Sequence, residues 1–65
     1  MKNYKILHSG MIVDGDVWYA IYVHSVDISR WIKEQPEHLW IKVPTIPAFD
    51  VHEELLSWLV LKFEQ

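Results

Sequence analysis

The chain contains no cysteine, and this single absence removes several classes of protein. Without thiols there is no disulfide framework, no thiol nucleophile, no iron–sulfur cluster and no cysteine-based zinc site. The absence also fits a reducing compartment, so we expect a cytoplasmic protein. A domain of 65 residues must then gain its stability from a very good core or from a partner subunit.

Positive charge and long apolar runs are also scarce. Six Lys and Arg residues stand against nine Asp and Glu residues, which gives a net charge of −3. A simple electrostatic nucleic-acid binder carries a basic excess, so this balance argues against one. No apolar run approaches the length of a membrane span, and the first short one is interrupted before Gly10. We therefore expect neither a membrane span nor a signal peptide.

The residue patterns that usually accompany chemistry are missing as well. The four histidines show neither the spacing of a helical zinc pair nor an HExxH motif. There is no glycine-rich phosphate loop, and no serine stands in a nucleophile elbow. The Asp14-Gly15-Asp16 segment lacks the further ligands of a calcium-binding loop. We therefore expect no enzymatic activity, no metal and no cofactor.

The chain is rich in hydrophobic residues, which make up 51% of the sequence and include four tryptophans. This content indicates one small ordered domain over residues 1–65. Residues 4–13 are predicted to form a strand with a bend near Gly10. Asp14-Gly15-Asp16 follows and is typical of a tight hairpin turn. Residues 17–24, which are rich in β-branched and aromatic side chains, complete the hairpin as a second strand.

The middle of the chain predicts a short helix and a third strand. Apolar residues recur at helical spacing over residues 27–35, with Ser25 or Asp27 available as the N-cap. Pro36 ends this helix. Residues 38–43 alternate between apolar and other side chains, which favours a strand.

The last third predicts a connector and a second helix. The two prolines in residues 44–47 indicate an extended connector. Asp50 with Glu53 resembles a capping box and predicts a helix over residues 51–64. A strand over residues 58–63 remains an alternative. One broad face of this helix is expected to point to the core: Leu55, Leu56, Leu59, Val60 and Phe63.

The resulting order is β-β-α-β-α. It predicts an α+β two-layer sandwich, with a three-stranded, mainly antiparallel sheet and the helices on one face. The period of two along each strand assigns the aliphatic residues to the core, among them Leu39, Ile41 and Val43. The face left uncovered then carries aromatic side chains: Trp18, Tyr22 and Trp40, with Tyr4 as a further candidate.

Such an aromatic face predicts an interaction surface, because large exposed apolar patches mark binding sites and Trp and Tyr dominate their energetics. The alternative is that a loop or the connector covers these aromatics and makes them core. Trp58 and Leu61 fall off the core stripe of the last helix and form a second candidate patch. Peripheral packing is the alternative for that pair.

The expected function is a small, non-enzymatic protein–protein interaction module that forms a homodimer or covers another protein. Small, acidic, cysteine-free, aromatic-rich α+β proteins are common among phage-encoded inhibitors. A phage- or plasmid-type inhibitor of a host or defence protein is therefore the expected class. The alternative is a small nucleic-acid-associated regulator or antitoxin, in which Lys42 beside Trp40 would assist stacking on a single strand.

Overall fold

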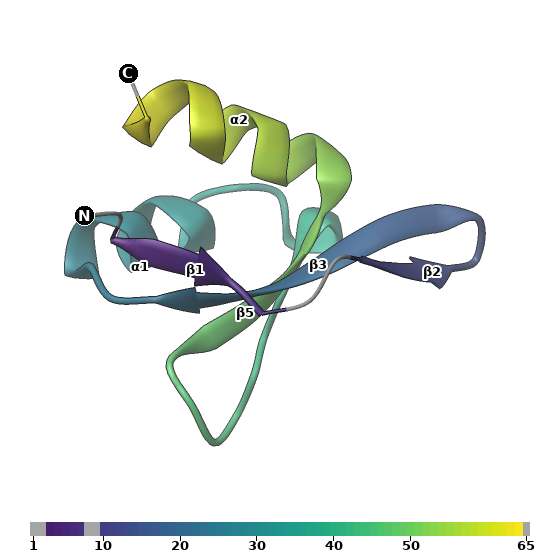
Figure 1. Cartoon of the computed structure of the whole chain (residues 1–65), viewed down its shortest axis with the longest axis horizontal. Helices are drawn as coiled ribbons and strands as arrows, with labels where there is room; N and C mark the ends of the chain where they lie inside the picture. Colours follow the sequence, from purple (N-terminus) through teal and green to yellow (C-terminus); the bar gives the residue numbers. More distant parts are fainter. Residues whose placement is uncertain (1–2, 8–9, 65) are drawn as a thin grey trace.

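A computed structural model of the chain describes residues 3–7 and 10–64 (Figure 1). The fold is α+β, with an antiparallel sheet of five strands and two helices, where the sequence predicted three strands. The elements follow in chain order: β1 (Tyr4–Ile6), β2 (Met11–Val13), β3 (Asp16–Val23), α1 (Val26–Lys33), the 3-10 turn η1 (Glu37–Leu39), β4 (Trp40–Lys42), β5 (Ala48–His52) and α2 (Glu53–Phe63). The sheet order is β1-β3-β5-β4, and β2 also pairs with β3.

The predicted hairpin between the first strands is confirmed. Val13 pairs with Asp16, which leaves Asp14 and Gly15 as a two-residue turn between β2 and β3. Both turn residues have positive φ, at 50° and 85°. A type I′ turn requires this at both positions, and its backbone twist matches that of the two strands it joins.

The predicted strand over residues 4–13 forms as two pieces along the same edge of β3. β1 pairs with the end of β3 and β2 with its beginning, which leaves Tyr19 and Ala20 of β3 between the two paired segments. Gly10 closes this interruption with φ at 130°, and a Cβ there would lie 3.2 Å from Cγ1 of Val17. The bend expected near Gly10 is therefore present, and the position requires glycine.

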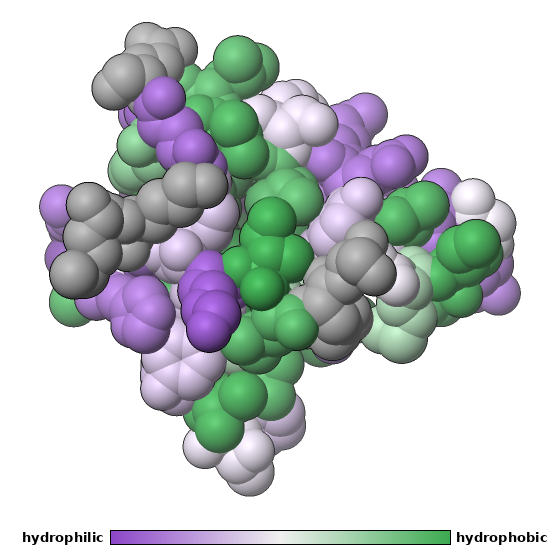
Figure 2. All heavy atoms as spheres, in the orientation of Figure 1, coloured by the Kyte–Doolittle hydropathy of each residue, from purple (hydrophilic) through white to green (hydrophobic). Residues whose placement is uncertain are grey.

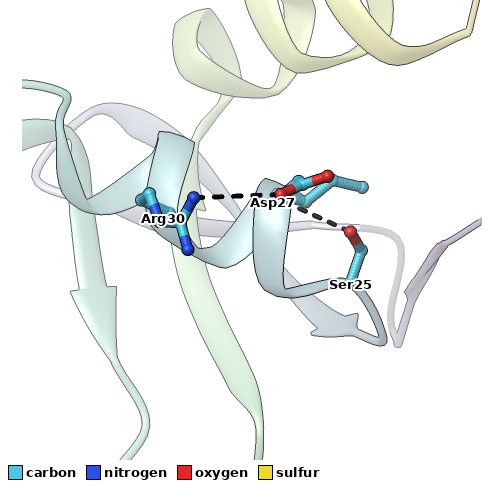
Figure 3. Close-up of polar contacts among 4 residues, drawn as sticks. Ser25, Asp27 and Arg30 are labelled. Atoms are coloured by element: carbon cyan, nitrogen blue, oxygen red, sulfur yellow. Dashed lines mark hydrogen bonds and ion pairs between the residues drawn. The ribbon is translucent and has the colours of Figure 1, made fainter.

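Helix α1 begins as expected, with Ser25 as its N-cap rather than Asp27. The Ser25 hydroxyl accepts a hydrogen bond from the backbone N–H of Ile28 at 3.4 Å (Figure 3). Asp27 instead lies in the first turn, 4.0 Å from the guanidinium of Arg30 (Figure 3). Both of these side chains are exposed, so the pair contributes little to stability.

The segment after α1 differs from the prediction. Residues 44–47 are not a free connector but the loop of a second hairpin, in which Lys42 pairs with Phe49 and the Val43 N–H donates to the carbonyl of Ala48 at 3.0 Å. The missed strand is β5, where buried Phe49 and Val51 alternate with half-buried Asp50 and His52. That alternation was visible in the sequence, but the apparent capping box at Asp50 obscured it.

The start of the last helix is corrected accordingly. Asp50 is a strand residue, and the N-cap of α2 is His52, whose Nδ1 accepts from the Glu54 N–H at 3.0 Å. Histidine is not among the favoured N-cap residues, so the sequence offered Asp50 as the stronger signal. Residues 58–63 are helical, which settles the alternative of a strand.

One side of the sheet and both helices share a single buried cluster. It contains Tyr4, Ile21, Val23, Ile28, Ile32, Leu39, Phe49, Val51, Leu55 and Leu59. Figure 1 shows α2 lying over the strands that supply this cluster. Tyr4, a candidate for the uncovered face, is 4% exposed and belongs to the core, and Val60, expected in the core, is exposed. No helix in the described ranges is long and apolar enough to cross a membrane.

Replacing Gly10 by Ala is expected to lower the free energy of unfolding by about 1–3 kcal/mol, because the new side chain meets both an unfavourable φ and a close neighbour. Gly15→Asn is the matched control. Its φ of 85° suits Asn better than most residues, and nothing lies within 4 Å of a Cβ there. Urea unfolding followed by tryptophan fluorescence measures both. A loss for Gly10→Ala no larger than for Gly15→Asn would contradict the close-approach argument.

Tyr4→Phe is expected to raise the free energy of unfolding by about 1 kcal/mol. The Tyr4 hydroxyl is buried and has no hydrogen-bond partner among the described residues. Removing an unsatisfied buried polar group relieves a desolvation cost while the ring stays in the core. Thermal and urea unfolding test this, and a clear loss of stability would show that the hydroxyl has a partner after all.

Candidate interaction surface

The pairing register assigns a second set of strand residues to the side of the sheet opposite the buried cluster. Directly paired residues share a side and successive residues alternate. We call this side the open face. It consists of Lys5, Met11, Val13, Asp16, Trp18, Ala20, Tyr22, Ile41, Ala48, Asp50 and His52.

Two of the predicted aromatic residues do lie on the open face. Trp18 is half-buried and its ring stands edge-on to the imidazole of His52, with ring centroids 5.6 Å apart. Tyr22, also half-buried, lies beside His24 with ring centroids 4.8 Å apart. The two residues are on the same strand but separated by Ala20, so they do not form one continuous aromatic surface.

The expected position of Trp40 is wrong. Trp40 pairs with buried Val51 and therefore lies on the core side, where its ring packs edge-on against Phe49 at 5.9 Å. Its indole N–H donates to the carbonyl of Gln35 at 3.0 Å. The prediction treats Leu39 as a strand residue that faces the core. It belongs to the preceding 3-10 turn, so the alternation starts one residue later.

The same one-residue change in alternation also exchanges the sides of the sheet on which Ile41 and Lys42 lie. Lys42, expected beside Trp40 on the open face, lies on the core side of this edge strand, and its ammonium donates to the carbonyls of Val43 and Ile46 at 2.6 and 2.8 Å. Ile41, expected in the core, pairs with Asp50 on the open face and is 57% exposed. The nucleic-acid alternative therefore loses the residue pair on which it rested.

The open face also holds apolar residues that sequence reasoning missed. Met11 and Val13 are 45% and 44% exposed and stand opposite Trp18 and Asp16 across the hairpin. Figure 2 shows hydrophobic side chains gathered at the end of the molecule where Figure 1 labels β2. The sequence contains the information to predict this, because a two-residue turn at Asp14-Gly15 dictates that Met11 and Trp18 share a face.

These residues surround a shallow hollow of about 100 Å³. Its lining consists of Met11, Val13, Trp18, Ile41 and Asp50. Four lining side chains are apolar and come from three different strands, whereas the fifth is a half-buried carboxylate. No hydrogen bond or ion pair to another described residue engages the Asp50 side chain.

A second carboxylate at the border of the open face is already engaged. Oδ1 of Asp16 lies 3.4 Å from Nε2 of His52. Because Nδ1 of His52 accepts the Glu54 N–H, a neutral imidazole must carry its proton on Nε2, which points it toward Asp16. His52 therefore joins the start of β3 to the start of α2 and supports the edge of Trp18.

The second predicted patch lies elsewhere. Trp58 and Leu61 are 38% and 64% exposed, as the helical periodicity predicted. They lie on α2, whose Leu55 and Leu59 are buried in the core. The core therefore separates this pair from the open face, and the two patches cannot bind as one surface.

The described part of the chain shows no cluster of side chains that would hold a metal ion. Within residues 3–7 and 10–64, no three His, Asp or Glu side chains come together as a metal site would require. His8, one of the four histidines, lies outside the described residues. The candidate site is therefore the apolar hollow whose lining includes the single carboxylate of Asp50.

His52→Ala is expected to lower the free energy of unfolding by about 1 kcal/mol, because the first turn of α2 loses its side-chain cap. His52→Asn is the matched variant, since Asn is a good N-cap and should lose less. Urea unfolding measures both changes. Equal losses for Ala and Asn would assign the effect of His52 to its contacts with Asp16 and Trp18 instead of to capping.

Comparison of the chain with models of protein families, with curated proteins and with solved structures gives no match. The case for a function therefore rests on the geometry of the open face.

Proposed function

We propose that the chain is a small, non-enzymatic protein–protein interaction module that binds its partner through the open face. In this proposal the molecule is a two-layer sandwich, in which the helices occupy one face of the sheet and the partner occupies the other. Binding is by surface coverage, as for an inhibitor of the phage or plasmid type that acts on a host or defence protein.

The observation that carries the proposal is the group of exposed apolar side chains around Trp18. Met11 and Val13 of β2 and Ile41 of β4 all border one hollow, and each is more than two-fifths exposed. Scattered single apolar residues are normal on a surface, but a contiguous group marks an interaction site. A Trp at the centre of such a group is typical of an interface hot spot.

A second copy of the chain is the competing occupant of the open face, as the expected homodimer would require. Light scattering after size exclusion, at high micromolar concentration, separates the two cases. A monomer leaves the face free for a different protein. A dimer that dissociates on substitution of Ile41 by Ser would assign the face to self-association and overturn the proposal of a different partner.

The direct test compares two aliphatic residues of similar exposure, one from each patch. Ile41→Ser removes an apolar side chain from the open face, and Leu61→Ser removes one from the outer side of α2. Tagged wild type and both variants are used to capture proteins from the native host, followed by mass spectrometry. We expect a protein captured by the wild type and by Leu61→Ser to be lost, or reduced roughly tenfold, with Ile41→Ser.

Circular dichroism and thermal unfolding of both variants serve as the folding control, since each substitution is at an exposed position. The opposite pattern, in which only Leu61→Ser loses the captured protein, would place the binding surface on α2. Equal capture by all three proteins would remove both patches from consideration as the interface.

A further inference from the structure

The hollow on the open face contains one feature that apolar contact alone does not explain. Asp50 stands in the middle of β5, between Ala20 of β3 and Ile41 of β4. It is half-buried, and no described residue supplies it with a hydrogen bond or a counter-charge. Asp is also one of the residues that strands disfavour.

Asp50 is the one charged side chain in the lining of the hollow. Partial burial limits the water around its oxygens, and the four apolar lining residues offer them no hydrogen bond. Asp50 caps neither α1 nor α2, because these helices are capped by Ser25 and His52. Among the described residues the carboxylate therefore has no polar partner, and a cation brought by another molecule would supply one.

The walls of the hollow define what kind of cation fits. Met11, Val13 and Ile41 offer apolar surface to an aliphatic stem, and Trp18 offers an aromatic ring to the charged group. The volume of about 100 Å³ suits one side chain and is small for an ordinary ligand pocket. A long side chain with a planar cationic end fits all three features. Its charged end can meet the carboxylate and the aromatic ring, and its aliphatic stem can lie against the apolar residues.

We propose that the hollow receives an arginine side chain of the partner protein, with the guanidinium paired to the Asp50 carboxylate and its stem against Met11 and Ile41. This assignment rests on the proposed function, since it names the chemistry of the group that the open face recognises. Arg is favoured over Lys because a planar guanidinium forms two parallel hydrogen bonds with a carboxylate and stacks on aromatic rings.

Charge also argues against a second copy as the occupant. Two open faces placed together about a two-fold axis through the hollow would bring Asp50 against Asp50 of the other molecule, and like charges across an interface are repulsive. The chain has a net charge of −3 and contains one arginine, Arg30, which lies on α1 and not among the open-face residues. A partner with a basic contact residue is the complementary choice.

The test uses short blocked peptides as probes and nuclear magnetic resonance of the isotope-labelled protein as the readout. The arginine probe is acetyl-Gly-Arg-Gly-amide, and the neutral control carries citrulline, which keeps the shape of arginine but not its charge. A lysine peptide is the third probe. We expect the arginine peptide to shift signals of Trp18, Ile41 and Asp50, and the citrulline peptide to bind roughly tenfold more weakly.

Two charge-matched substitutions complete the experiment. Asp50→Asn is expected to weaken the arginine peptide roughly tenfold. Asp14→Asn removes the same charge from the nearby hairpin turn, where Asn suits the positive φ of 50°, and is expected to leave binding unchanged. If Asp50→Asn and Asp14→Asn weaken binding equally, the effect is one of net charge and the assignment is overturned. Binding of the citrulline peptide as tight as that of the arginine peptide would also overturn it. Equal binding of the lysine peptide would overturn the preference for a guanidinium.

Failure of this assignment is distinguishable from failure of the proposed function. If Asp50→Asn leaves the arginine peptide unaffected while Ile41→Ser still loses the captured protein, the arginine assignment is wrong and the interaction surface stands. If the arginine peptide binds in an Asp50-dependent way but Ile41→Ser captures as the wild type does, the hollow recognises cations and the proposed function is wrong.

Discussion

The pairing of β3 with β5 is the interaction on which the rest of the structure depends. β3 carries β1 and β2 along one edge and β5 along the other, and β5 in turn carries β4. On one side of this pair, Ile21 and Phe49 stand opposite each other in the core. On the other side, Trp18 and Asp50 contribute to the hollow. The core and the candidate site are therefore two sides of the same strand pair.

This arrangement explains why the candidate site combines residues that lie far apart in the chain. The β2–β3 hairpin brings Met11 and Val13 to Trp18, and the β4–β5 hairpin brings Ile41 to Asp50. Neither hairpin forms the hollow alone, because its lining needs both. The helices pack against the core side, whereas the open face retains exposed apolar groups and an acid that pairs with no described residue. The proposed partner would supply what the open face lacks.

Sequence reasoning was accurate where the structure is local. The Asp14-Gly15 turn, the bend at Gly10 and the Ser25 cap are each determined by a few neighbouring residues, and all three are present. It was inaccurate where two local signals competed. Asp50 resembled a helix cap, and Leu39 resembled a residue within a strand. A one-residue error in strand alternation exchanges the two faces, which is why Trp40 and Ile41 were interchanged.

By itself, the sequence determined the α+β composition of the chain, its first hairpin and the helical periodicity that left Leu61 exposed, because turn chemistry and apolar spacing act over short distances. Only the tertiary structure decided which aromatic residue belongs to the core, and that Asp50 stands among apolar side chains with no partner in the described part of the chain. The reason is that strand register depends on contacts between residues distant in sequence. The side on which a residue of β4 lies follows from its pairing with β5, which no local pattern specifies.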